Sequence, residues 1–112
     1  MTISLDELRK ANFRRDTEYP GSSGCDLGFR TVEFAGEAGE VCDAIKKYLR
    51  HIRGIKGSTA SHQDIADEMA DVLITLDLLA MELGINLSEA LILKFNRTSE
   101  KLGLDTTLPL SK

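Results

Sequence analysis

The chain has 112 residues, a length typical of one domain, and 29% of them are charged and 42% hydrophobic. Its formal net charge of −4 argues against general nucleic-acid binding, for which a basic surface is typical. No apolar run approaches the roughly 20 residues that a membrane span requires, and the N-terminal MTISLDELRK has no apolar signal core. We therefore expect a cytoplasmic protein without stable contacts to nucleic acid or membrane.

The sequence pattern predicts four helices and almost no strand alternation. The predicted helices cover about residues 4–15, 27–53, 61–83 and 86–102. Ser4 with Glu7 forms a capping box that opens the first helix. Gly54, Gly84 and Gly103 directly follow the other three, as is typical of helix C-termini. The expected fold class is all-α, of the four-helix-bundle type.

The third predicted helix is apolar around nearly its whole circumference, which is typical of a buried helix. Four helices of one chain cannot easily surround one of their own, so we expect a dimer or a tetramer. Within this helix Asp77 is expected to be buried, either bonded across an interface or capping a neighbouring helix. Cys42, at a core-like position of the second helix, is expected to be a buried free thiol.

Two helices carry matched rows of carboxylates. Glu33, Glu37 and Glu40 are spaced by four and then three residues, which places them within an arc of roughly 60°. A second row, on the third helix, has the same spacing. The members of this second row are Asp64, Glu68 and Asp71, and Asp67 lies beside them. Like charges one turn apart destabilise a helix, and burial makes the repulsion worse.

Neither row has lysine or arginine interleaved on its face, so bound divalent cations are the economical compensation. A cluster made only of oxygens favours Mg²⁺, or Mn²⁺ in its place, over zinc or iron. His51 and His62 lie outside both rows, which disfavours a carboxylate-bridged redox site. The simpler alternative is that each row is a solvated helix face, but two matched rows favour a shared cation site.

The two rows lie within a longer resemblance. The strings GEAGEVCDAIKK (36–47), DIADEMADVLITLDLLA (64–80) and KFNRTSEKLGL (94–104) resemble the MazG-like all-α nucleoside triphosphate pyrophosphohydrolases, in particular their phage and bacterial branch. The Gly-Glu-x-Gly-Glu form is also similar to the dCTP pyrophosphatase branch. The resemblance implies one MazG-like domain over 1–112, with a core at about 27–104 and a tail at 105–112.

The resemblance implies an oligomeric, Mg²⁺-dependent enzyme. Its substrate would be a nucleoside triphosphate, with deoxynucleotides favoured, and its products the monophosphate and pyrophosphate. By motif position the metal ligands would be Glu37, Glu40, Glu68 and Asp71. On the last helix, Lys94, Asn96 and Lys101 occupy positions where relatives place substrate contacts.

The sequence departs from the family pattern at Gly36, where some relatives carry a further glutamate that is a candidate general base. Glu33, one turn earlier, could serve in its place, and Glu37 is the other catalytic candidate. For the nucleobase, any of three aromatic residues could provide a stacking surface or simply be core. These are Phe13, Tyr19 and Phe29. The main rival hypothesis is a non-catalytic helical oligomer, or regulatory module, with a structural Mg²⁺ site.

Overall fold

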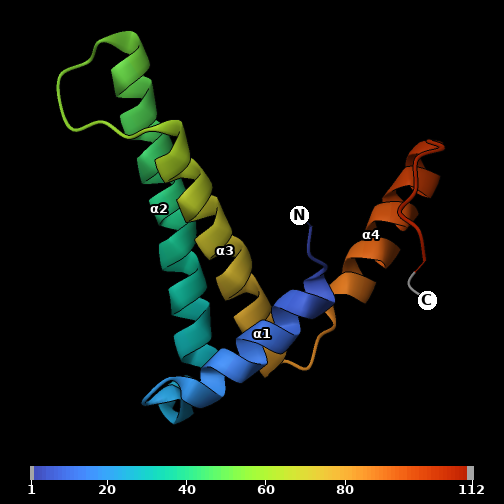
Figure 1. Cartoon of the computed structure of the whole chain (residues 1–112). Helices are drawn as coiled ribbons and strands as arrows, with labels where there is room; N and C mark the ends of the chain where they lie inside the picture. Colours follow the sequence, from blue (N-terminus) through green and yellow to red (C-terminus); the bar gives the residue numbers. More distant parts are fainter. Residues whose placement is uncertain (1, 111–112) are drawn as a thin grey trace.

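A computed structural model describes residues 2–110, and within that range the regular structure is entirely helical (Figure 1). The elements are α1 (Leu5–Glu18), a short 3₁₀ helix η1 (Ser22–Gly24), α2 (Leu27–Arg53), α3 (His62–Glu82) and α4 (Leu87–Leu102). The all-α fold class and the four α-helices are thereby confirmed. No helix of the described range is both long enough and apolar enough to span a membrane.

Local chemistry explains where the helices begin and end. The capping boxes at Ser4 and Ser61 are both present, and the Asn86 side chain accepts a hydrogen bond from the backbone N–H of Glu89 at 3.0 Å. α1 continues past its predicted end at Arg15, because the sequence has no helix breaker before Pro20. The other ends agree with the sequence pattern to within about one residue, as local capping signals allow.

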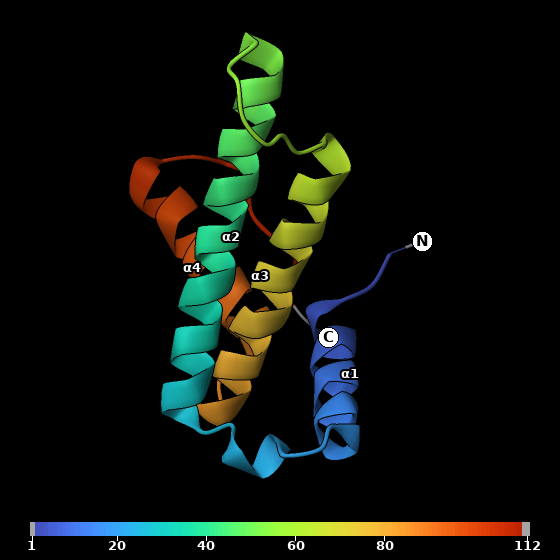
Figure 2. The ribbon, with the colours of Figure 1, turned by 90° about the vertical axis from the view of Figure 1, so that its left-hand side faces the viewer.

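The helices of one chain do not close into a four-helix bundle. α2 and α3 form an antiparallel hairpin, and α1 packs across α3 near the end where α2 begins (Figures 1 and 2). α4 contacts α1 and projects away from the hairpin as a separate arm (Figure 1). The bundle expected from the sequence is therefore not completed within a single chain.

Little of the apolar surface is buried in one chain. Among residues 2–110, the buried hydrophobic residues are Ala44 and Ala80. On α3, expected to be buried all round, Met69 remains 53% exposed and Leu73 46%. Cys42 is also exposed, contrary to expectation, because no helix of the same chain covers its side of α2.

A polar clamp fastens α1 to α3. Asp77 is buried as expected, with 1% of its surface exposed, and it pairs within the chain instead of across an interface. Arg9 Nε donates to both of its carboxylate oxygens, at 3.1 and 3.2 Å, and Asn12 Nδ2 donates to Oδ2 at 2.9 Å. A further Arg9 nitrogen donates to the carbonyl of Ile85 at 2.7 Å, so the clamp also holds the α3–α4 turn.

Candidate metal centre

Three carboxylates from two helices converge on one side of the α2–α3 hairpin. Glu37 comes from α2, whereas Glu68 and Asp71 come from successive turns of α3. One carboxylate oxygen from each lies within 4.8 Å of the others. Glu37 and Glu68 are half-buried and Asp71 is exposed, so the cluster is less enclosed in one chain than the sequence suggested. We call these three residues the acid cluster.

Burial and electrostatic repulsion both raise pKa values within this group. Partial burial raises the pKa of Glu37, and repulsion from Asp71 and Glu40 raises it further. Partial burial likewise raises the pKa of Glu68, with added repulsion from Glu40 and Asp71. Glu40 itself is exposed and lies outside the three-residue convergence, although it is near enough to act on both glutamates.

The outer members of the two rows have other partners. Asp64 caps α3, where its carboxylate accepts the backbone N–H of Ser61 at 2.7 Å, and this bond lowers the pKa of Asp64. Asp67 accepts a hydrogen bond from Gln63 Nε2 at 2.8 Å. Asp64 is therefore a capping residue and does not join Glu68 and Asp71 at the convergence.

Glu33 belongs to a second group, organised around a buried arginine. Arg30 is 5% exposed, and its guanidinium contacts Glu33 Oε1 at 3.1 Å and Asp16 Oδ1 at 2.7 Å. Glu82 lies 4.0 Å from Arg30 Nε. Although burial opposes the charge, Glu33 and Asp16 help to keep the pKa of Arg30 above its usual value. We call Arg30 and its three carboxylates the balanced cluster.

Comparison with known sequences supports the family. The sequence model of the MazG-like family matches residues 39–112. The chain belongs to the MazG-like family. It is also 35% identical over 74 residues to the Gene 37 protein of Mycobacterium phage L5, an alignment that covers 62% of this chain and 64% of the phage protein. The chain thus spans less than two thirds of that relative's length.

The matched region of this MazG-like chain includes Glu40, Glu68 and Asp71, whereas Glu33 and Glu37 precede it. Membership of the family favours nucleotide pyrophosphohydrolase activity and a divalent metal. The residues present fit such a metal, because three carboxylates with convergent oxygens form a hard, all-oxygen donor set. Within residues 2–110, no lysine or arginine forms an ion pair with the acid cluster.

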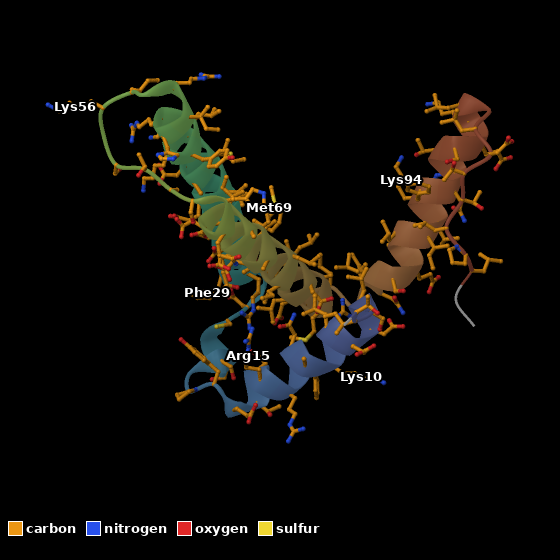
Figure 3. The ribbon with its side chains drawn as sticks, turned by 45° about the horizontal axis from the view of Figure 1, so that its top comes forward. Lys10, Arg15, Phe29, Lys56, Met69 and Lys94 are labelled. Carbon is orange, nitrogen blue, oxygen red and sulfur yellow. The ribbon has the colours of Figure 1, made fainter. Side chains whose placement is uncertain are left out.

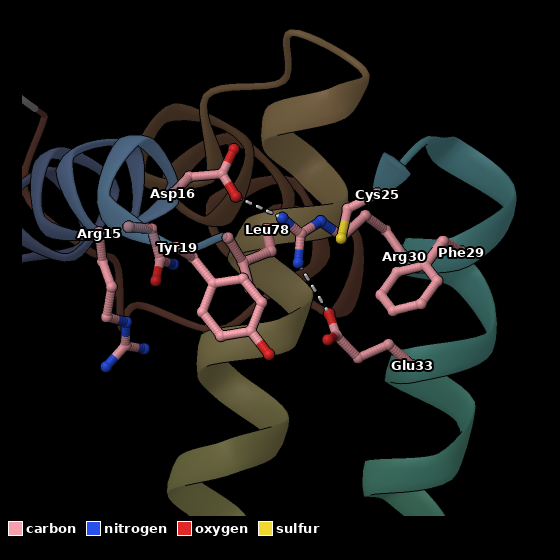
Figure 4. A pocket seen from close by; sticks show the side chains of 9 residues that line it. Arg15, Asp16, Tyr19, Cys25, Phe29, Arg30, Glu33 and Leu78 are labelled. Atoms are coloured by element: carbon pink, nitrogen blue, oxygen red, sulfur yellow. Dashed lines mark hydrogen bonds and ion pairs between the residues drawn. The ribbon is translucent and has the colours of Figure 1, made fainter. Parts of the chain in front are cut away.

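A pocket of about 380 Å³ lies beside the acid cluster, between α1 and the first turns of α2 (Figure 4). Two of the three aromatic candidates, Tyr19 and Phe29, line it. Phe13 is not among the lining residues. Glu33 also lines it and is one turn from Glu37, so the pocket and the carboxylates adjoin.

The predicted substrate contacts on α4 lie on a different arm of the molecule. Figure 3 shows Lys94 on α4, well separated from Phe29 and Met69 on the hairpin. Lys94 and Lys101 are exposed. The Asn96 amide pairs with the backbone of Leu108, donating to its carbonyl at 2.9 Å and accepting its N–H at 2.7 Å. The fold of one chain does not bring these residues to the acid cluster.

Arg30 is a buried residue of the site that the sequence pattern did not indicate. Its position three residues before Glu33 is the spacing of a helical ion pair, and that spacing could have shown that Glu33 has a partner. The contact with Asp16, however, depends on how α1 returns to α2 through η1. Asn12, which also lines the pocket, was missed because an asparagine inside a helix has no sequence signature of its own.

Proposed function

We propose that this chain hydrolyses nucleoside triphosphates, preferentially deoxynucleotides, to the monophosphate and pyrophosphate, with Mg²⁺ as its metal. One observation carries the proposal most directly: Glu37, Glu68 and Asp71 converge while no ion pair within residues 2–110 balances them. Repulsion at such a site is relieved when a cation binds. Mn²⁺ has similar ligand preferences and should replace Mg²⁺.

The substrate's own charge requires the metal. A triphosphate carries about four negative charges, which an acidic site repels unless the local sign is inverted. A divalent cation held by Glu37, Glu40, Glu68 and Asp71 would supply that positive charge and lower the pKa of a bound water. Glu40, although outside the close convergence, is the next carboxylate on the same face of α2 and stays in the proposed ligand set.

Glu33 is the proposed proton acceptor. Its Oε1 accepts a hydrogen bond from Arg30, which fixes the carboxylate at the edge of the pocket. Its Oε2 has no recorded partner among the described residues, so it can accept a proton from an attacking water. Glu37, one turn nearer to the α3 carboxylates, is the alternative acceptor, in addition to its role as a ligand.

The pocket suits the nucleobase and the chain's cations suit the phosphates. Tyr19 and Phe29 offer aromatic surfaces at its walls, on which a base can stack (Figure 4). Lys94, Asn96 and Lys101 are proposed phosphate contacts, and because α4 projects away from the hairpin they would come from a second copy of the chain.

A dimer or tetramer is part of this proposal. Exposed apolar side chains occur on α2, α3 and α4. Examples are Val32 with 73% of its surface exposed, Met69 with 53% and Phe95 with 40%. A chain of this length with so small a core gains most by burying these faces against another copy. Sedimentation equilibrium is expected to show a dimer or larger species, and a stable monomer would contradict this part of the proposal.

The decisive experiment is a panel of nucleoside and deoxynucleoside triphosphates with Mg²⁺, scored by product identity. Monophosphate plus pyrophosphate is the expected outcome, and EDTA should abolish it. Diphosphate plus phosphate would reject cleavage between the α- and β-phosphates. A folded, Mg²⁺-bound protein that turns over none of the substrates would instead support the non-catalytic oligomer.

A further inference from the structure

The side-chain amide of Asn12 has a fixed orientation. Asn12 lies on α1 and is 2% exposed. Its Nδ2 donates to Asp77 Oδ2 at 2.9 Å and to the backbone carbonyl of Ile74 at 3.3 Å. Both partners are acceptors, so a flipped amide would place Oδ1 against two other oxygens. Oδ1 must therefore lie on the opposite side.

Because Asn12 is one of the residues that line the pocket, the side chain's remaining polar atom, Oδ1, is assigned to the pocket side. Asn12 lines the pocket together with Tyr19 and Phe29, and it is the most buried of the lining residues. Among the described residues, no donor is recorded for Asn12 Oδ1. Asn12 Oδ1 is nevertheless not sealed off from the surface. Among residues 2–110, Arg30 Nε is the only side-chain nitrogen or oxygen that is both fully buried and without a hydrogen-bond partner, so Oδ1, which also lacks a partner, must retain some exposure. The deepest wall of the pocket thus presents a hydrogen-bond acceptor of fixed direction.

We propose that Asn12 is a specificity-determining residue that selects nucleobases carrying an amino group, and not an oxo group, at the position farthest from the sugar. The inference rests on the proposed function, because it assumes that the pocket holds the base. In the proposed pose the sugar lies toward Glu33, the lining residue that is one turn from Glu37, and the distal edge of the base lies against Asn12. On a pyrimidine this is the 4-substituent, and on a purine the 6-substituent.

The chemistry of that contact separates the bases. The 4-amino group of cytosine and the 6-amino group of adenine donate to Oδ1. The 4-oxo group of uracil or thymine, and the 6-oxo group of guanine or hypoxanthine, would place two acceptors face to face. A buried polar group left without its partner incurs the full free-energy cost of its desolvation. This cost is larger than the net stabilisation from one neutral hydrogen bond.

Asp77 acts on this contact as a positioning residue. It does not line the pocket, but it fixes the Asn12 amide and is itself fixed by Arg9. In an Asp77→Asn variant, Arg9 would retain the new amide oxygen as its acceptor, so the amide nitrogen would face Asn12. Asn12 would then meet a donor from residue 77 and an acceptor from Ile74, and neither orientation would satisfy both.

The first test compares substrates that differ only at the distal position, dCTP against dUTP and dATP against dITP. The wild-type protein is expected to favour the amino member of each pair by about tenfold or more in kcat/KM, the factor that one unpaired buried acceptor costs. Equal values within both pairs would overturn the inference while leaving the hydrolase proposal intact.

A binding measurement separates failure of the inference from failure of the proposed function. Calorimetric titration with dCMP and dUMP needs no turnover, and the same preference of about tenfold for dCMP is expected. If no triphosphate is hydrolysed but dCMP binds more tightly than dUMP, the selection by Asn12 stands and the hydrolase proposal falls. Equal affinities would reject the selection.

The variant test uses Asp77→Asn with Arg9→Lys as its matched control. Asp77→Asn is expected to bring the ratio of dCMP to dUMP affinity close to one, because the Asn12 amide loses its fixed direction. Arg9→Lys also weakens the clamp, because it loses the forked contact, but it keeps a cation beside Asp77, whose carboxylate remains the acceptor for Asn12, so the ratio should persist. An unchanged ratio in a folded Asp77→Asn protein would overturn the positioning role. Should that variant not fold, the two wild-type comparisons still decide the inference.

Discussion

Two groups of carboxylates lie at neighbouring turns of α2, and they differ in what balances them. In the balanced cluster, Glu33 shares the buried guanidinium of Arg30 with Asp16 and, at a longer distance, Glu82. In the acid cluster, Glu37 faces two carboxylates of α3, and no cation of residues 2–110 forms an ion pair with it. Each group has three carboxylates, but only the first contains a buried cation that pairs with its members.

The difference indicates which group is structural and which can take a ligand. A carboxylate that is paired with a buried arginine ties α1 to α2. Removing one partner would leave the other as a buried charge without compensation, which destabilises the fold. Partial burial and then mutual repulsion raise the pKa values of Glu37 and Glu68, and an external cation stabilises carboxylates in such a setting. The presence or absence of a paired cation, more than the spacing of the carboxylates, therefore distinguishes the balanced cluster from the acid cluster.

The largest expected effect comes from the acid cluster. Asp71→Asn is expected to lower hydrolysis by about a thousandfold or more, because it removes a charged metal ligand without changing the shape of the side chain. Its helix content should be unchanged, since a like-charge repulsion is removed as well. Pyrophosphate release and circular dichroism provide the measurements.

Asp67→Asn is the matched control, because Asp67 is exposed on the same helix and bonds only to Gln63 in the described residues. It should retain activity. Equal losses in the two variants would show that the acid cluster has no special role. Unfolding of Asp71→Asn would instead assign its carboxylate to the fold.

The next effect tests whether Glu33 acts in catalysis as well as in the balanced cluster. Glu33→Gln keeps an oxygen acceptor for Arg30 but cannot take a proton from water. We expect kcat to fall by about a hundredfold, the usual contribution of a general base, with little change in KM. Glu82→Gln is the control, since Glu82 also lies near Arg30 but does not line the pocket. If both variants keep full activity, the proton acceptor is Glu37 or solvent.

The ion pairs of the balanced cluster should contribute to the free energy of unfolding. Arg30→Met is expected to lower the free energy of unfolding by about 2 to 3 kcal/mol. This is less than for a fully buried pair, because the Asp16 and Glu33 side chains remain 27% and 28% exposed. Urea unfolding measures the loss.

Arg15→Met provides the comparison, because Arg15 is an exposed cation that lines the same pocket. Its removal should change stability by no more than about 0.5 kcal/mol, as is usual at a surface. A similar loss in both variants would mean that Arg30 contributes no more than a surface charge does.

The smallest expected effect is stabilisation by the metal. At a Mg²⁺ concentration ten times its Kd, the free energy of unfolding should rise by about 1.4 kcal/mol through mass action. The rise should be retained in Asp67→Asn and absent in Asp71→Asn, with ionic strength held constant by NaCl. An equal rise of the Tm in the Asp71→Asn variant would place the cation elsewhere.

The sequence by itself determined the helices and the chemistry of the acid rows. Capping at Ser61 and Asn86 and the glycines after α2 and α4 act within about four residues of chain, so their signal is complete locally. The matched helical spacing predicted that Glu37 faces Glu68, and the α2–α3 hairpin brings these two residues together.

Only the tertiary structure decided which acids meet at one site. The bonds of Asp64 to Ser61 and of Glu33 to Arg30 are local, but the second partner of Arg30, Asp16, comes from another helix. The pairing of Asp77 with Arg9 and the exposure of Cys42 likewise depend on where α1 crosses α3 and on which faces no helix covers. Such contacts join residues distant in sequence, and their partners are set by the crossing of helices and the path of the turns, which local periodicity does not encode.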